Sequence, residues 1–299
     1  MKKINKNQIN QEVFELYDQY AHNKIQRREF IEKLSFYAVG GLTVPALLEY
    51  LLPDYRNTLI TNPEDPNLES KMIEYNSPRG GGKIKGLLSM PTQIHAEKGT
   101  KVGGIVVVHE NRGLNPYIAD TARQAALAGF VTLAPDALSP LGGYPGNDDE
   151  GRAMQRERDR DEMLEDFIAA YDYLKNHEKV NGKIGVVGFC FGGWVSNMMA
   201  VRVSDLAAAV PFYGSQPDAE DVPHINAPLM LHYAELDERI NEGWPAYQKS
   251  LEAYDKDYEV FFYPGANHGF HNTSTPRYDP GAARLAWERT IRFFKENLG

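Results

Sequence analysis

The stretch KIGVVGFCFGGWVSNMMA, from Lys183 to Ala200, decides the fold class. Its opening run, Ile184 to Val187, is apolar and rich in β-branched residues, which predicts a buried strand. Apolar residues then recur at helical spacing in the second half of the stretch. Cys190, the only cysteine of the chain, stands between the two halves, with Gly188 and Gly192 two residues away on either side. Because side chains at those flanks would clash, the pattern predicts a sharp strand-to-helix turn with a cysteine at its apex.

The turn around Cys190 admits two interpretations. Cysteine is among the most often buried residues, so this one could simply fill a tight turn. Alternatively, the motif Gly-x-Cys-x-Gly presents a nucleophile, as Gly-x-Ser-x-Gly does. The second interpretation requires a base and a carboxylate at neighbouring strand ends, and the rest of the chain decides whether they exist.

Composition and charge exclude several classes of protein. The chain has 299 residues, 42% of them hydrophobic, so it can bury one large core or two modest ones. Its net charge of −9 argues against nucleic acid as a partner. A single cysteine excludes an internal disulfide framework. A metal site from His109, His232 or His271 is considered, but their spacing matches no compact ligand motif. We therefore predict neither a metal nor a cofactor.

The N-terminal segment has two interpretations. Its most apolar run, LSFYAVGGLTVPALLEYLLP, is interrupted by glycine, proline and glutamate, so we predict no stable membrane span. The preceding QRREFIEKL carries Arg27-Arg28 and resembles a twin-arginine export signal. However, no small-x-small cleavage site follows, and QEVFELYDQYAHNKI is typical of an amphipathic helix. We favour a helical extension packed on the main domain and a cytoplasmic protein, with export to the periplasm as the alternative.

The chain divides into residues 1–70, a helical extension with a polar linker from 54, and residues 71–299, an α/β domain. In the second part strands alternate with helices, and several strands are continuous apolar runs. This predicts a mostly parallel sheet covered by helices on both faces. Two strands joined by PRGGG are predicted to form a hairpin at its start. Helices are expected over 118–129, over 152–176 and over the closing segment 280–298.

In such sheets the chemistry collects at the carboxyl ends of the strands. Cys190, Asp237 and His268 each follow a predicted strand, in the chain order nucleophile, acid, histidine that is found in the α/β-hydrolase fold. The histidine would take the thiol proton and the carboxylate would orient the histidine. A cysteine at the start of a helix also favours a thiolate, and the N–H of Phe191 can bind an oxyanion.

Each member of this set also has an ordinary structural interpretation. Asp237 could merely cap the next helix, and His268 could be a loop histidine without a partner. His232 lies inside a predicted strand and is expected to be a hydrogen-bonded core histidine. His22 and His224 lie in polar stretches, and we assign them no role. The coincidence of turn, acid and histidine at three strand ends favours catalysis.

With these residues assembled, the chain resembles the dienelactone hydrolase family of α/β-hydrolases. The resemblance covers about Met72 to Leu298 and rests on GFCFGG, VVVHENRG, LAGFVTLAPDAL, HYAELDERI and YPGANHGF. It implies that the cysteine is the nucleophile, that Glu110 contacts it and governs its ionisation, and that the N–H of Asn111 is the second oxyanion donor. The first 70 residues lie outside the family pattern.

One departure from the family affects substrate binding. Family members hold a substrate carboxylate with a serine directly after the histidine and an arginine one turn later, whereas this chain has Gly269 and Asn272. Lactone hydrolysis of the family's diagnostic substrate is therefore less certain than the mechanism. The candidates for substrate binding are His109, Arg112, Tyr144, Arg152, Tyr213, His271 and Arg277.

We therefore predict a thiol-dependent hydrolase of activated esters or lactones that works through an acyl-enzyme. The partner would be a small-molecule ester or lactone, and assembly of copies through the N-terminal helices is left open. The first alternative is a broad carboxylesterase or thioesterase on the same fold. A dehalogenase is disfavoured because it would normally need a carboxylate at the turn. The last alternative is a non-catalytic interaction protein, which the intact set of three residues disfavours.

Overall fold

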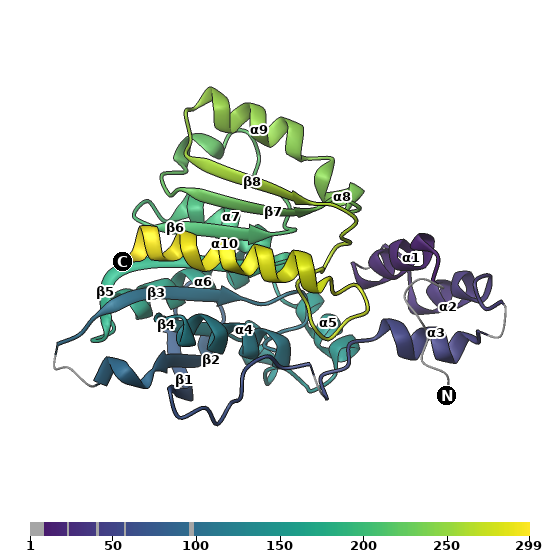
Figure 1. The fold of residues 1–299 in the computed structure, drawn as a ribbon, viewed down its shortest axis with the longest axis horizontal. Coiled ribbons are helices and arrows are strands. Elements are labelled where there is room, and N and C mark those ends of the chain that lie inside the picture. The colour runs from purple at the N-terminus through teal and green to yellow at the C-terminus, as the bar shows by residue number, and fades with distance from the viewer. Residues whose placement is uncertain (1–8, 23, 40–41, 57, 96–98) are drawn as a thin grey trace.

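The computed structural model describes residues 9–299 apart from 23, 40–41, 57 and 96–98. The described chain forms one sheet of eight strands in the order β1-β2-β4-β3-β5-β6-β7-β8 (Figure 1). β1 (Leu68–Ser77) and β2 (Gly82–Pro91) form an antiparallel hairpin, and β2 also pairs antiparallel with β4. The other pairings are parallel and involve β3 (Val102–Val108), β4 (Val131–Pro135), β5 (Val180–Phe189), β6 (Ala208–Phe212), β7 (Leu229–Ala234) and β8 (Tyr258–Tyr263). The predicted hairpin and the mostly parallel sheet are confirmed.

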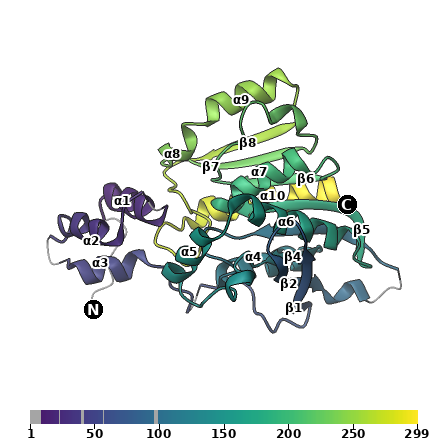
Figure 2. The ribbon, with the colours of Figure 1, turned by 180° about the vertical axis from the view of Figure 1, so that it is seen from behind.

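Helices cover both faces of the sheet because the strands are apolar on both sides. In β3, Val106 and Val108 pack into one core with α6 (Arg160–Lys175), α7 (Phe191–Arg202) and α9 (Trp244–Ala253). Ile105 and Val107 of the same strand pack into a second core with α4 (Pro116–Leu127) and α10 (Pro280–Leu298). This alternation follows from the two-residue period of a strand. Figure 2 shows α6 and α7 on the face opposite α10.

One predicted helix is wrong. The segment 152–176 was expected to be continuous, but the structure has α5 (Asp148–Glu157) and α6, separated at Arg158 and Asp159. Asp159 is extended and its carboxylate accepts from the N–H groups of Asp161 and Glu162. Asp159 is therefore the N-cap of a second helix, inside a charged run whose sequence indicated only a solvated face.

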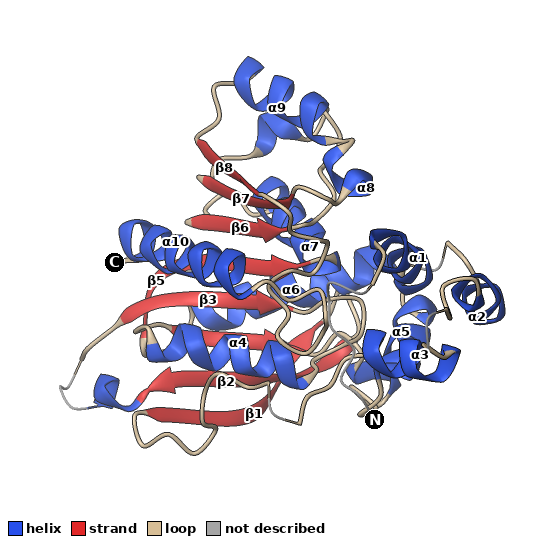
Figure 3. Cartoon of the chain, turned by 45° about the vertical axis from the view of Figure 1, so that its right-hand side comes forward, coloured by secondary structure: helices blue, strands red, loops and turns tan. Residues whose placement is uncertain are grey.

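The described residues before Pro53 form three helices. They are α1 (Gln11–Ala21), α2 (Arg27–Ser35) and α3 (Val44–Leu51), whose buried side chains build a core of their own around Phe30 and Leu34. Figure 3 shows the parallel strands pointing toward these helices, which therefore lie at the carboxyl end of the sheet. Arg27 and Arg28 begin α2. The cytoplasmic location and the export alternative stay predictions.

Short helical turns complete the fold: α8 (Glu238–Asn241) and the 3₁₀ turns η2 (Thr92–His95), η3 (Ser139–Leu141) and η4 (Val222–His224). His232 is fully buried in β7, and its ring nitrogens contact the hydroxyls of Thr290 and Tyr263. The prediction of a hydrogen-bonded core histidine is confirmed. Within the described residues, none of the helices combines the length and apolar character that crossing a bilayer requires.

Candidate active site

Cys190 lies at the apex of the turn between β5 and α7, with φ at +58°. A Cβ on Gly188 would lie 1.9 Å from the carbonyl oxygen of Gly192, and a Cβ on Gly192 would lie 2.5 Å from that of Val108. Both flanking glycines are thus required by steric contact with backbone, as the sequence predicts. The turn is tight enough to hold the cysteine in a left-handed conformation that side chains rarely adopt.

Asp237 and His268 come together beside this turn. The Nδ1–H of His268 donates to Oδ2 of Asp237 at 2.5 Å, and both side chains are buried. Asp237 is also the N-cap of α8 and accepts from the N–H of Ile240 at 3.4 Å. This carboxylate thus caps α8 and contacts His268 at the same time, and its catalytic role stays a prediction. One oxygen of a buried acid fixes a helix start, and the other fixes the tautomer of the histidine.

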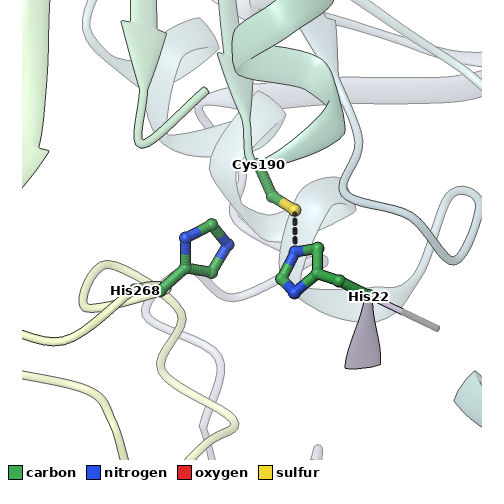
Figure 4. Close-up of side chains that lie close together, drawn as sticks. All are labelled: His22, Cys190 and His268. Atoms are coloured by element: carbon green, nitrogen blue, oxygen red, sulfur yellow. Dashed lines mark hydrogen bonds between the residues drawn. The ribbon is translucent and has the colours of Figure 1, made fainter. Parts of the chain in front are cut away.

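The residue nearest to the cysteine in this site is one that the sequence reasoning missed. His22, at the C-terminal end of α1, has its Nε2 at 3.2 Å from Sγ of Cys190 (Figure 4). The Nδ1 of His22 contacts the carboxylate of Asp18 at 3.1 Å. We assigned His22 no role, and the structure corrects this. The available signal was the Asp18–His22 pair at i, i+4 spacing on an amphipathic helix, but nothing local pointed to a cysteine 168 residues away.

His268 lies on the other side of the sulfur. Figure 4 shows the rings of His22 and His268 both facing the region of Cys190, and their centroids are 4.8 Å apart. The Nε2 of His268 is buried and has no hydrogen-bond partner among the described residues. In sites without substrate such contacts are often long and tighten on binding. The free nitrogen is thus available to a substrate atom or to water.

The electrostatic surroundings favour a thiolate at Cys190. Burial alone would raise the pKa of the thiol, but the imidazoles of His22 and His268 outweigh burial and hold the pKa well below its usual value. Burial likewise opposes protonation of His268, but Asp237, Asp18 and the thiolate raise its pKa to about 10. The pKa of His22 is raised for the same reason, by Cys190 and Asp18 against burial. The electrostatics thus favour a thiolate at Cys190 and protonated imidazoles at His22 and His268.

Glu110 follows β3 and is buried at the same edge of the sheet. The amide of Asn272 donates to its Oε2 at 2.8 Å. Burial raises the pKa of Glu110, Arg112 opposes this, and the neighbouring Cys190 thiolate adds to it. Asn272, the residue at the departure from the family pattern, thus contacts the glutamate. Its amide holds the carboxyl in place without adding a charge.

A family model described as the dienelactone hydrolase family matches residues 85–298, well over half of the chain. The chain belongs to the dienelactone hydrolase family. It is therefore an ester or lactone hydrolase with the α/β-hydrolase fold. A second model, described as YqhI-like, matches residues 1–40, the segment that contains Asp18 and His22.

Individual relatives agree with this family. The Escherichia coli (strain K12) protein YghX is 48% identical over 118 residues, which span 40% of this chain and 97% of YghX. Carboxymethylenebutenolidase 1 of Cupriavidus pinatubonensis is 26% identical over 71% of this chain and 92% of its own length. The solved dienelactone hydrolase of Anabaena variabilis superposes with a TM-score of 0.58 and 20% identity, over 78% of this chain and all of its own. The superposition supports the fold.

The oxyanion candidates of this family member come from two segments, the start of α7 and the loop after β3. Phe191 is the first residue of α7, and the first N–H groups of a helix have no acceptor within it. Asn111 follows Glu110 after β3, and its side-chain amide donates to the carbonyl oxygen of Ala21 at 2.7 Å. Asn111 therefore also ties the end of α1 to the catalytic edge of the sheet.

Three of the predicted substrate-binding residues lie in the hydrolase core. His109 is fully buried, with Nδ1 at 2.6 Å from the carbonyl oxygen of Glu110 and Nε2 accepting from the N–H of Ala137. His271 contacts the hydroxyl of Tyr117 at 2.8 Å, and burial lowers its pKa to about 3. Tyr213 is fully buried, with its ring centroid 5.0 Å from that of His268. The contacts of His109 and His271 are with core residues, whereas Tyr213 contacts His268, and a part in substrate binding stays a prediction for all three.

Three other candidates hold the N-terminal helices or the loop beneath them. Arg112 donates to Asp148 at 2.9 Å, and the hydroxyl of Tyr144 donates to the same carboxylate at 2.8 Å. The guanidinium of Arg152 lies 4.0 Å from the ring centroid of Tyr20 in α1. Arg277 lies 3.4 Å from Asp18. Of the predicted substrate-binding residues, Arg277 is the one that lines a cavity beside His268.

That cavity has a volume of about 500 Å³ and opens beside His268. Its walls come from α1, from the segment around α8 and from the loop after β8. Charged side chains of both signs line it: Glu15, Asp18, Lys24, Asp237, Glu238, Arg239, Glu242, His268 and Arg277. The N-terminal helix is therefore one wall of the pocket next to His268.

Among the described residues, His22, Cys190 and His268 bring three metal-ligating atoms within 4.8 Å of one another. Two imidazoles and a thiolate are ligands that zinc accepts. However, Nη2 of Arg239 lies 3.2 Å from Nε2 of His22 and 3.3 Å from Nδ1 of His268. A guanidinium there opposes a second cation by Coulomb repulsion. The absence of a metal stays a prediction.

Proposed function

We propose that this dienelactone hydrolase family member is a thiol-dependent hydrolase of activated esters or lactones, with Cys190, His268 and Asp237 as its catalytic set. The observation that carries the proposal is the position of Cys190, at a strained turn on the carboxyl edge of the sheet, beside a histidine that Asp237 holds at 2.5 Å. A base with a free Nε2 next to a nucleophile is the arrangement that acyl transfer needs.

The reaction would proceed in two halves. The thiolate of Cys190 attacks the carbonyl carbon, and the N–H groups of Phe191 and Asn111 bind the resulting oxyanion. The carbon–oxygen bond to the leaving group then breaks, and that oxygen takes a proton from the His268 imidazolium. Water attacks the thioester next, giving its proton to His268, and the thiolate leaves. Esters with stabilised leaving groups, such as enol lactones, suit a soft nucleophile that is itself a good leaving group.

The class of substrate is supported by the family, since Carboxymethylenebutenolidase 1 is a relative over most of its length. Recognition of a substrate carboxylate would fall to Arg277 and Arg239, the arginines that line the cavity. Both already contact Asp18. A substrate anion would therefore compete with a carboxylate of the protein, which favours neutral esters or lactones over strongly anionic ones.

The test is Cys190→Ala on the full chain, assayed with a 4-nitrophenyl ester and a panel of lactones. Removing a nucleophile typically costs on the order of a million-fold in kcat, and the loss of one sulfur at a turn apex should cost little packing. Ser196→Ala, another small side chain of α7, is the control and should keep full activity. Turnover that survives in Cys190→Ala would refute the mechanism, provided that both variants melt near the wild type.

A further inference from the structure

Cys190 faces two histidine–carboxylate pairs, and the proposed mechanism uses one. The first pair is His268 with Asp237. The second is His22 with Asp18, in which Nε2 contacts the sulfur at 3.2 Å. Its Nδ1 lies 2.9 Å from the backbone carbonyl oxygen of Asp18 and 3.1 Å from the carboxylate of the same residue. Each histidine therefore presents Nε2 to the site and Nδ1 to a carboxylate, which is the arrangement that fixes an imidazole and stabilises its protonated form.

The second pair is held in place by residues of the hydrolase domain. Arg239 donates to Asp18 at 3.1 Å, and Arg277 contacts the other oxygen of the same carboxylate at 3.4 Å. Directly before His22, the carbonyl oxygen of Ala21 accepts from Asn111 at 2.7 Å. Both ends of the dyad are thus anchored to loops that carry the catalytic set. The contact with Cys190 is preorganised by these anchors.

We propose that His22 is a catalytic residue of this enzyme: its imidazolium keeps Cys190 ionised, with Asp18 as its positioning residue, and leaves His268 free for the leaving group and for water. The inference rests on the proposed function, because it assigns a role relative to the Cys190 nucleophile. It adds to the site a catalytic residue that lies outside residues 85–298, the part that matches the family model.

The proton accounting of the cycle is complete with two imidazoles. In the resting enzyme the thiol proton is on Nε2 of His22, and His268 is protonated. The carbon–sulfur bond forms, the ester carbon–oxygen bond breaks, and His268 gives its proton to the leaving oxygen. Neutral His268 then takes a proton from the attacking water, the carbon–sulfur bond breaks, and the acid product and the thiolate are released. His22 stays protonated throughout as the counter-ion of the sulfur.

Other charges also act on the sulfur and set how far His22 can control it. Arg239, 3.2 Å from Nε2 of His22, favours a thiolate but disfavours protonated His22, and Asp18 offsets it by contacting both. Glu110 disfavours the thiolate from the opposite side when it is ionised. The groups that face Cys190 from the surrounding elements are Asp18 and His22 of α1, Glu110 after β3, Tyr213 after β6, Asp237 and Arg239 of α8, and His268 and Arg277 after β8.

The opposite role is that of a plug that keeps substrate from the sulfur. Asp18 of α1 and His268 line the cavity of about 500 Å³, whereas Cys190 and His22 do not, so the cavity fits both roles. The two roles predict changes of opposite sign when His22 is replaced. This makes the sign of the effect the deciding measurement.

The first experiment measures the alkylation of Cys190 by iodoacetamide against pH, by intact mass, on the full chain. His22→Gln should raise the pH midpoint by at least about one unit, which is about a tenfold loss of thiolate below it. Asp18→Asn should raise it by less. His95→Gln removes an exposed histidine that also contacts a carboxylate, Glu69, and should leave the midpoint unchanged. All buffers contain EDTA, since the same three side chains could bind a stray divalent metal.

The second experiment separates the two halves of the reaction by rapid mixing with 4-nitrophenyl acetate. His22→Gln should slow the acylation burst about tenfold at neutral pH and leave deacylation within about twofold of wild type. His268→Gln should do the reverse: the thiol is still alkylated at neutral pH, and an acyl-enzyme accumulates that is visible by mass. Melting temperatures of all variants identify any that fail to fold.

The inference is overturned if His22→Gln leaves both the alkylation midpoint and the burst rate unchanged. It is equally overturned if either rate increases, which would make His22 a plug. These outcomes differ from a failure of the proposed function, which is turnover that persists in Cys190→Ala. If Cys190→Ala abolishes turnover and His22→Gln changes neither rate, the proposed function stands and the inference alone is rejected.

Discussion

Glu110 is a buried acid close to the sulfur of Cys190. Its carboxyl is buried and accepts a hydrogen bond from the uncharged Asn272 amide, and the charges of Arg112 and Arg277 oppose the effect of burial on its pKa. Ionisation of Glu110 lowers the fraction of Cys190 that is present as thiolate, because two anions a short distance apart disfavour each other. The residue therefore links the ionisation of the nucleophile to that of a second group.

Glu110→Gln tests this link. Glutamine keeps a carbonyl oxygen for Asn272 but cannot ionise, so the pH midpoint for alkylation of Cys190 should fall by up to about one unit. The unfolding midpoint should change less than the alkylation profile does. The measurement is the same mass-based titration, with a thermal melt alongside. An alkylation profile identical to wild type would mean that Glu110 is a structural residue.

At the scale of elements, α1 reaches the active site because α5 holds it there. Arg152 of α5 places its guanidinium 4.0 Å from the ring centroid of Tyr20 and donates to the carbonyl oxygen of the same residue at 3.3 Å. The aromatic contact and the hydrogen bond both act on Tyr20, two residues before His22. A displacement of α5 would therefore change the contact between His22 and the sulfur of Cys190.

Arg152→Ala is expected to loosen α1 without touching the catalytic set. Loss of a buried cation–π contact and a hydrogen bond should lower the free energy of unfolding by about 1 to 3 kcal/mol. The alkylation midpoint of Cys190 should move up, in the direction expected for His22→Gln. Arg284→Ala removes an exposed i, i+4 pair with Glu288 and should change stability by no more than about 0.5 kcal/mol. An unmoved alkylation midpoint in Arg152→Ala would show that α1 docks independently of α5.

Local patterns explain which elements could be predicted from the sequence. The strand before Cys190, the hairpin and the closing helix have clear apolar periods, so their positions follow from the chain alone. The division of the helix at Asp159 could not be predicted, because the sequence does not distinguish a capping aspartate within RERDRDE from a solvated one. His22 was missed for a different reason: its partner lies in another element, and periodicity carries no information about contacts between elements.

At the scale of the whole molecule, the hydrolase core contains neutral histidines that resist protonation. Burial lowers the pKa of His271 to about 3 and that of His232 well below its usual value. In the unfolded chain both would titrate near 6.5. Below that pH the unfolded state binds more protons, so the stability that these groups contribute is complete above about 6.5 and is lost as the pH falls toward their folded values.

The free energy of unfolding should therefore fall as the pH is lowered from about 6.5 to about 4, and His271→Gln should make that fall shallower. The difference approaches about 5 kcal/mol in the limit of full titration, since each unit of pKa is worth about 1.4 kcal/mol. Urea unfolding at a series of pH values measures the slope, with His95→Gln as an exposed control that should leave it unchanged. Equal slopes for His271→Gln and wild type would mean that this ring is already solvated in the folded protein.

The presence of only one cysteine has a consequence for the lifetime of the enzyme. In the proposed mechanism the ionised sulfur attacks the ester, and the same ionised form is the one that peroxides oxidise, first to a sulfenic acid. Since the chain has no second thiol, the sulfenic acid cannot form an internal disulfide. Its reduction back to the thiol then depends on a small external thiol. Preparations exposed to air should therefore lose activity that dithiothreitol restores early and fails to restore once the sulfur has become a sulfinic acid.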